Sequence, residues 1–236
     1  MFKLNSFSKA CLEIRESLYG FKAVSQIRSN QYNISTGSAF MIAPGIVTTA
    51  AHLLHVENNP ARPRHGSFLV IRAPDVGQEM EQCVFINEDT ERDVALLRIN
   101  NPRSTHCVKF QPNKIIVGTN CGSLGFPLAY IDRNTGAFQL VERFQGAYIS
   151  SFNTHTIQSG RQISFYETDA LMYKGSSGCP GFLIDAKIYG MHNKSIIDQP
   201  EATSGDDQRQ GTRLAISLWI PAADIVAFAK DNGINL

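Results

Sequence analysis

The sequence predicts an all-β fold, and two observations support that prediction. From Ala23 to about Ser217, short runs rich in Val, Ile, Phe, Tyr and Thr are separated by Gly, Pro, Asn and Asp. Short apolar runs with frequent turn residues are typical of barrels or a sandwich rather than of alternating strands and helices. The polar, proline-bearing stretch 100–113 then divides these runs into two halves.

The two ends of the chain predict helices. Near the N-terminus, Ser8 can cap a short helix with one apolar side, and Gly20 stands where a glycine often ends a helix. Near the C-terminus, residues 221–233 predict a helix that begins with Pro221 and ends at Gly233.

Between these helices, each apolar run is interpreted as one strand. The first half predicts strands at 37–42, 45–49, 67–71, 82–86 and 94–99. The second half predicts strands at 114–117, 122–124, 138–149, 161–168, 181–184 and 214–220. The most polar segment, 198–211, is expected to be a mobile loop.

Composition excludes several classes of function. Of the 236 residues 43% are hydrophobic and 18% are charged, with a formal net charge of +1. Lysine and arginine form no cluster interleaved with aromatics, so no nucleic-acid partner is expected. No apolar run is long enough to cross a bilayer, and the N-terminus lacks the apolar core of a secretory signal. The five cysteines are widely spaced without a CxxC pair, which favours free thiols and a cytoplasmic location.

Three segments hold a reactive side chain in a special local setting. His52 follows a predicted strand and two small alanines, so its ring can face a cleft. Asp93 precedes an apolar strand that must be largely buried, and a buried carboxylate needs a partner. Residues 173–182, YKGSSGCPGF, place Ser177 among glycines whose backbone can adopt unusual dihedral angles.

Together these segments suggest acyl transfer by a serine. Such chemistry needs a base, a carboxylate that orients the base, and backbone N–H donors for the oxyanion. Ser177 is then the nucleophile, His52 the base and Asp93 the orienting acid, and the N–H groups of Gly175 and Ser177 can converge on one oxyanion.

The same three segments resemble the trypsin-like (chymotrypsin-fold) serine peptidases. The family signatures TAAH, DxAL and GxSGxP correspond here to residues 49–52, 93–96 and 175–180. Segments 124–127 and 168–170 are similar to HtrA-like bacterial members, and we expect no room for an appended PDZ domain. The resemblance implies one peptidase domain over 1–236 with two six-stranded antiparallel β-barrels, at about 21–105 and 114–220, followed by the helix at 221–233. Nothing in the sequence suggests a metal or organic cofactor, and none is expected.

Several residues compete with the predicted ones. The family pattern favours Ser177 over Ser176, and it makes Cys179 a buried filler because viral relatives place their cysteine at the nucleophile position itself. His55 lies beyond the predicted strand end. Asp89 sits in a polar turn and is expected to be solvated.

The specificity pocket is predicted from the same resemblance. It assigns substrate binding to Leu171, Met172, Gly190, Met191 and His192. No aspartate stands at the pocket base, so an apolar P1 side chain is favoured over Arg or Lys. The alternative is a Glu or Gln side chain, because a G-x-H motif serves that purpose in glutamyl endopeptidases and picornaviral 3C proteases.

Two functional classes follow from these predictions. The first is a serine endopeptidase that acts on a protein or peptide substrate. The second is a binding or regulatory protein of the same fold, with activity that is latent until a protein effector orders the site. Secreted members carry an aspartate just before the nucleophile to receive a new N-terminus, whereas Ser176 occupies that position here. Activation by N-terminal cleavage is therefore not expected.

Overall fold

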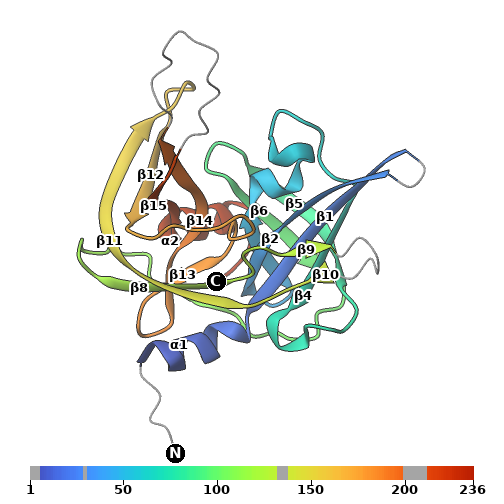
Figure 1. The fold of residues 1–236 in the computed structure, drawn as a ribbon, viewed down its shortest axis with the longest axis horizontal. Helices are drawn as coiled ribbons and strands as arrows, with labels where there is room; N and C mark the ends of the chain where they lie inside the picture. The colour runs from blue at the N-terminus through green and yellow to red at the C-terminus, as the bar shows by residue number, and fades with distance from the viewer. Residues whose placement is uncertain (1–5, 29–30, 132–137, 199–211) are drawn as a thin grey trace, which may run out of the picture.

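Two rings of antiparallel strands form the core of the molecule (Figure 1). The computed structural model describes residues 6–28, 31–131, 138–198 and 212–236. The first ring is a closed barrel with the strand order β1-β2-β3-β6-β5-β4. Its strands are β1 (Leu18–Arg28), β2 (Gln31–Ala43), β3 (Ile46–Ala50), β4 (Ser67–Arg72), β5 (Glu81–Asp89) and β6 (Val94–Ile99).

The second ring has the order β13-β8-β11-β12-β15-β14, and β13 also pairs with β14, which closes it. Its strands are β8 (Asn120–Gly125), β11 (Arg143–Thr156), β12 (Gln162–Thr168), β13 (Pro180–Phe182), β14 (Lys187–Asp198) and β15 (Thr212–Pro221). The short strand β7 (Lys109–Phe110) runs parallel to β14, and β9 (Tyr130–Ile131) pairs with β10 (Phe138–Gln139). The predicted all-β fold with two six-stranded barrels is thereby confirmed.

Each ring encloses its own apolar core, as expected for strands whose side chains alternate between two faces. In the first barrel the fully buried side chains include Tyr19, Phe21 and Leu54. In the second, Trp219 and Tyr189 pack with 5.6 Å between ring centroids. A third cluster, which includes Phe40 and Phe126, joins residues of both rings and so fixes how the two barrels meet.

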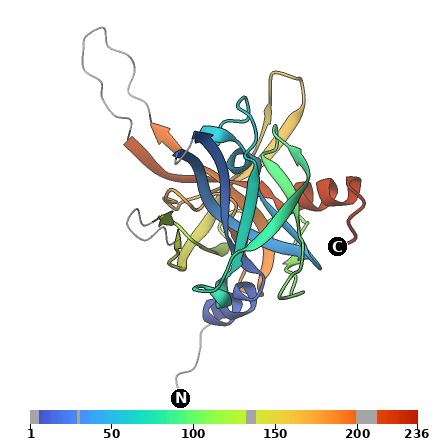
Figure 2. The same ribbon diagram turned by 90° about the vertical axis from the view of Figure 1, so that its right-hand side faces the viewer.

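Two helices lie outside the rings, at separate places on the surface (Figure 2). Helix α1 (Ser6–Arg15) packs Phe7 against Phe144 and Phe182 of the second ring, at centroid distances of 5.6 and 6.3 Å. At its other end, Arg15 Nε donates to Glu142 and Nη2 donates to the carbonyl of Ala73 beside the first barrel. Helix α2 (Ala222–Asp231) covers β14 and β15.

The N-terminal boundary differs from the prediction. Helix α1 ends at Arg15, and Leu18 already begins β1. Gly20 does not end a helix but pairs with Ser38 of β2. A Cβ at position 20 would lie 2.7 Å from a terminal methyl of the Leu140 side chain, which packs over this glycine. The second helix was predicted correctly, with Pro221 preceding α2 and Gly233 following it at φ +75°.

The strand predicted at 114–117 is absent from this described segment, which forms a turn. Ile116 and Val117 are 80% and 57% exposed, so their apolar, β-branched character reflects no buried strand. Strand β14 was not among the predicted strands, because its sequence KIYGMHNKSIID mixes apolar and polar residues without strict alternation. Residues 199–211 of the predicted loop lie outside the described residues.

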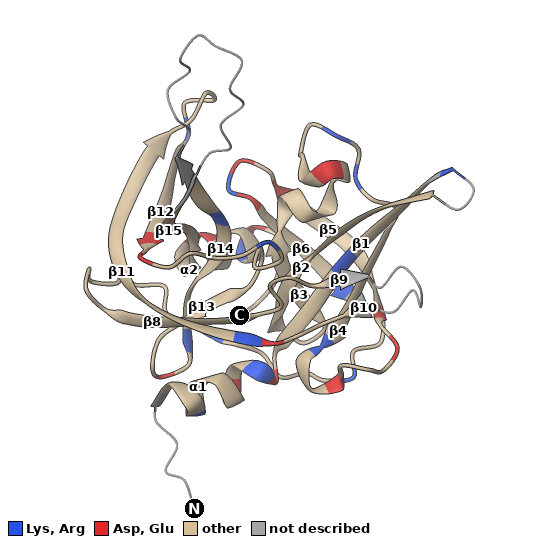
Figure 3. Cartoon of the chain, viewed as in Figure 1, with Lys and Arg blue, Asp and Glu red and all other residues tan. Residues whose placement is uncertain are grey.

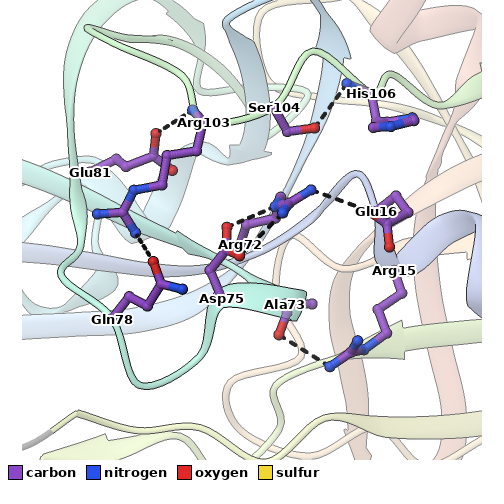
Figure 4. A network of polar contacts seen from close by, with 10 residues as sticks. All are labelled: Arg15, Glu16, Arg72, Ala73, Asp75, Gln78, Glu81, Arg103, Ser104 and His106. Atoms are coloured by element: carbon purple, nitrogen blue, oxygen red, sulfur yellow. Dashed lines mark hydrogen bonds and ion pairs between the residues drawn. The ribbon is translucent and has the colours of Figure 1, made fainter.

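A polar network ties the first barrel to the segments around it (Figure 4). Arg72, at the end of β4, binds both carboxylate oxygens of Asp75 at 2.8 and 3.1 Å and also donates to Glu16 at 3.1 Å. Asp75 belongs to the 3₁₀ turn η3 (Ala73–Asp75). Glu81 accepts the backbone N–H of Arg103 in the connection between the barrels. This network therefore holds two segments against the same side of the first barrel: Glu16, which follows α1, and Arg103, which lies in the connection between the barrels.

Basic and acidic residues are interspersed along the described chain, and segments of both colours occur in the first and the second ring (Figure 3). Among the described helices, none combines the length and apolar character needed to cross a membrane.

Candidate active site

The histidine and the carboxylate predicted from the sequence are in direct contact. His52 lies in the 3₁₀ turn η1 (Ala51–Leu54), directly after β3, and Asp93 precedes β6, which pairs with β3. Asp93 Oδ1 accepts the backbone N–H of His52 at 2.7 Å, and Oδ2 lies 2.7 Å from His52 Nδ1. An ionised carboxylate only accepts hydrogen bonds, so Nδ1 carries the proton and Nε2 of the neutral ring is free to accept one.

A third donor to Asp93 comes from Asn193 on β14. Its Nδ2 lies 2.6 Å from Asp93 Oδ2, in a buried contact. Asn193 directly follows His192 of the predicted specificity pocket, but no role was predicted for it. Asparagine has no distinctive sequence signal, and only the pairing of the two barrels brings β14 to Asp93.

Ser177 lies in the same cavity as His52. Within the described part of the chain, its hydroxyl donates to the carbonyl oxygen of Asn193 at 3.4 Å and makes no hydrogen bond to His52. Hydrogen bonds between catalytic groups are often formed only when substrate is present. The Ser177 hydroxyl must therefore exchange its contact with Asn193 for one with His52 before Nε2 can accept its proton.

The loop before Ser177 leaves two N–H groups available. Gly175 has φ +93°, and a Cβ there would lie 2.9 Å from the carbonyl oxygen of Phe126, so only glycine fits. The carbonyl of Lys174 accepts the N–H of Leu128 at 2.7 Å, and that of Ser176 accepts the N–H of Cys179 at 2.9 Å. In a trans peptide the C=O and N–H point in opposite directions. The N–H groups of Gly175 and Ser177 therefore face away from these partners, and neither has an acceptor among the described residues.

His52, Asp93 and Ser177 line one cavity of 610 Å³. Of the predicted substrate-binding residues, Met172 and His192 line it. Leu171, Gly190 and Met191 do not: Leu171 accepts a hydrogen bond from Gln145, and the other two pair with β15. Further lining residues that the sequence analysis missed are Pro60, Thr90, Glu91, Ile157, Ile163, Phe165, Tyr173, Lys174, Asn193, Lys194 and Ser195.

His192 is the most unusual polar residue of this cavity. It is 3% exposed, and neither ring nitrogen has a hydrogen-bond partner among the described residues. Its ring meets Trp219 edge-on, with 5.1 Å between centroids. Burial, followed by the nearby His52, lowers the pKa of His192 from 6.5 to about 3. The imidazole is therefore neutral at physiological pH.

The rival residues have other roles. Ser176 and Cys179, both 1% exposed, line a smaller cavity of 280 Å³ that does not include Ser177. Burial raises the pKa of the Cys179 thiol, which agrees with a packing role. His55 contacts Glu88 and the carbonyl of Arg62.

The expectation for Asp89 was wrong. Its side chain is 10% exposed and pairs with Arg161 at 2.6 Å, because the β11–β12 hairpin brings that arginine to it.

Three comparisons show which known proteins this chain is similar to. The family described as "Trypsin-like peptidase domain" matches residues 37–191. A DegP-like protein of Halomonas elongata, described as a periplasmic serine endoprotease, is 23% identical over 203 residues, covering 84% of this chain and 36% of that protein. The chain thus spans about a third of the length of this curated relative. The active form of the Rv3671c protease from M. tuberculosis superposes with a TM-score of 0.67 at 16% identity, covering 96% of this chain and 85% of that one.

Proposed function

Because the chain belongs to the trypsin-like peptidase family, we propose that it is a serine endopeptidase in which Ser177, His52 and Asp93 carry the reaction. The observation that carries this proposal is the pair of 2.7 Å contacts from His52 to Asp93, in a cavity that Ser177 also lines. Similarity to the DegP-like endoprotease supports the reaction class.

In the proposed reaction, Ser177 Oγ attacks the substrate carbonyl and His52 Nε2 takes the hydroxyl proton. The negative oxygen that forms binds to the N–H groups of Gly175 and Ser177. His52 then gives the proton to the leaving amine, and an ester between Ser177 and the substrate acyl group remains. Water attacks this ester by the same route in reverse and releases the acid. Asp93 holds the ring in the required tautomer and stabilises its charged form.

Constitutive activity and effector-gated activity remain distinct candidates. The contact of the Ser177 hydroxyl with Asn193 rather than His52 is compatible with both, because such hydrogen bonds often form only when substrate is present. We do not propose activation through a new N-terminus, because the neutral Ser176 hydroxyl cannot form an ion pair. An unprocessed chain that is inert and becomes active when trimmed near residues 20–30 would contradict this.

For the substrate, we propose a protein or peptide with an apolar P1 residue. Met172 in the cavity wall supports this preference. The alternative is an amide side chain, supported by the unpartnered ring of His192, which is neutral and therefore cannot balance the charge of a glutamate. Profiling a peptide library with wild type and His192→Leu separates the two, because only an amide preference depends on the imidazole.

A reducing, intracellular location is also part of the proposal. All five cysteines are free, and Cys83, Cys121 and Cys179 are buried. Structural disulfides are common in oxidising compartments and rare in the cytosol. Fractionation of cells that express the native protein tests this directly.

Labelling with a fluorophosphonate probe tests the function itself. Wild type should be labelled, whereas Ser177→Ala and His52→Ala should not. Ser176→Ala is the matched control and should still be labelled, because Ser176 does not line the substrate cavity. If no condition gives labelling of the folded wild type, the chain is a binding or regulatory protein of this fold.

A further inference from the structure

Ser38 connects the first barrel to the loop that carries Ser177. It lies on β2 and is fully buried. Its N–H donates to the carbonyl of Ser177 at 2.9 Å. Its hydroxyl donates to the carbonyl of Gly175 at 3.4 Å and accepts the N–H of Phe126 at 3.1 Å. One residue of the first barrel therefore holds two carbonyl groups of a loop that belongs to the second.

Two glycines pack closely against Ser38. A Cβ at position 125 would lie 3.0 Å from Ser38 Oγ, and one at position 178 would lie 2.2 Å from the Ser38 carbonyl oxygen. The carbonyl of Ser38 itself accepts the hydroxyl of Thr49 at 2.7 Å. Removal of the hydroxyl would leave the buried N–H of Phe126 and the carbonyl of Gly175 without this partner, and such groups are costly to leave unpaired.

The backbone at Gly175 needs an external restraint. Glycine has no Cβ and populates many dihedral angles, so residue 175 does not by itself fix the backbone at φ +93°. The peptide group before Gly175 is held through the Lys174 carbonyl by the N–H of Leu128. Two hydrogen bonds hold the peptide group between Gly175 and Ser176. The Gly175 carbonyl accepts the Ser38 hydroxyl, and the Ser176 N–H donates to the Tyr173 carbonyl at 3.0 Å.

We propose that Ser38 is a positioning residue whose hydroxyl keeps the N–H of Gly175 directed at the oxyanion. This inference rests on the proposed peptidase function. Both N–H donors of the oxyanion site lie in a loop of the second barrel. The proposal therefore means that a residue of the first barrel helps to form this site.

Ser38→Ala tests the proposal, with Ser35→Ala as the matched control. Ser35 lies on the same strand, is also buried, and bonds to His65 and the carbonyl of His55, away from the Ser177 loop. We expect Ser38→Ala to lower kcat about 10²-fold, the smaller of the losses known for removal of one oxyanion donor. The affinity for a peptide aldehyde, whose hemiacetal oxygen occupies the oxyanion position, should fall by a similar factor. The affinity for the product peptide, which forms no oxyanion, should stay within about twofold.

Ser35→Ala should lose thermal stability, but its kcat and its affinity for the peptide aldehyde should match those of wild type. Equal kcat and aldehyde affinity in wild type and Ser38→Ala would overturn the proposal, and so would equal losses in both variants. If Ser38→Ala does not fold, Ser38→Cys, whose slightly larger thiol is a weaker hydrogen-bonding group, should show the same losses in smaller measure. Absence of fluorophosphonate labelling in the wild type would instead overturn the proposed function, which separates the two failures.

Discussion

The side-chain amide of Asn193 lies 2.6 Å from Oδ2 of Asp93, the same oxygen that faces Nδ1 of His52. Asp93 thus receives hydrogen bonds from two different segments, η1 beside the first barrel and β14 of the second. These hydrogen bonds fix the orientation of the Asp93 carboxylate. The carboxylate in turn fixes the orientation of the His52 ring through Nδ1.

Asn193→Ala should lower kcat with little loss of fold. Hydrogen bonds to a charged group contribute about 1.5–3 kcal/mol, so a decrease of about 10- to 100-fold is expected. Kinetics normalised by active-site titration measure this effect. The control is Asn87→Ala, which removes an exposed amide bonded to Asn232 and should leave kcat unchanged. An unaltered kcat in Asn193→Ala would show that Asp93 needs only its contacts with His52.

Gly175→Ala should abolish most of the activity. The new Cβ would meet the Phe126 carbonyl at 2.9 Å and the Leu128 N–H nitrogen at 3.1 Å, so the loop must move and carry the N–H of residue 175 with it. A loss of about 10² or more in kcat is expected from one displaced oxyanion donor. Gly118→Ala is the control, because Gly118 has a similar φ of +89° with no neighbour within 4 Å. Similar losses of activity in both variants would mean that backbone strain alone, rather than displacement at residue 175, is responsible.

His192 should make the protein less stable in acid. Its pKa is lowered from 6.5 to about 3 in the folded protein, so between these pH values the unfolded chain binds more protons than the folded one. The free energy of unfolding should therefore rise with pH over this window, by up to about 1.4 kcal/mol per pH unit from this residue.

Urea denaturation at several pH values between 4 and 6.5 measures this slope. His192→Leu, which has no titrating group, should have a shallower slope than wild type. Parallel curves would indicate that the imidazole reaches solvent or a hydrogen-bond partner in solution.

Asp75→Asn should destabilise the first barrel at neutral pH. Hydrogen bonds from Arg72 lower the pKa of Asp75 below 3.8. The stabilisation is therefore present above pH 3.8 and is lost as the pH falls through the folded-state pKa. At pH 7 the variant should lose about 1–2 kcal/mol, the size expected for a bidentate arginine–carboxylate pair.

Thermal denaturation at pH 7 and at pH 3 measures the difference, which should shrink at the lower pH. Asp185→Asn is the control, because its pair with Lys187 is about half exposed and contributes less. A larger effect in the control would contradict the structural role of the Arg72–Asp75 pair.

Local sequence was sufficient for much of the fold. Strand β6 has the predicted bounds because Val94–Ile99 is a short apolar run buried on both faces. Helix α2 was predicted because proline and glycine act on the backbone directly, whatever surrounds them. The predictions failed where tertiary packing, rather than local sequence, set the structure. Gly20 is typical of a helix end but lies in β1 beneath Leu140. Ile116 and Val117 are typical of a strand but form an exposed turn.

The sequence by itself determined which side chains are proposed to react. His52 after two alanines, Asp93 before a buried strand and Ser177 among glycines each depend on their immediate neighbours, so their settings can be read along the chain. Only the tertiary structure decided what supports them. Asn193 and Asp93 are 100 residues apart, and Ser38 and Gly175 are 137 apart. Contacts over such separations arise from the way two barrels pack, and an isolated asparagine or serine carries no local pattern that reports them.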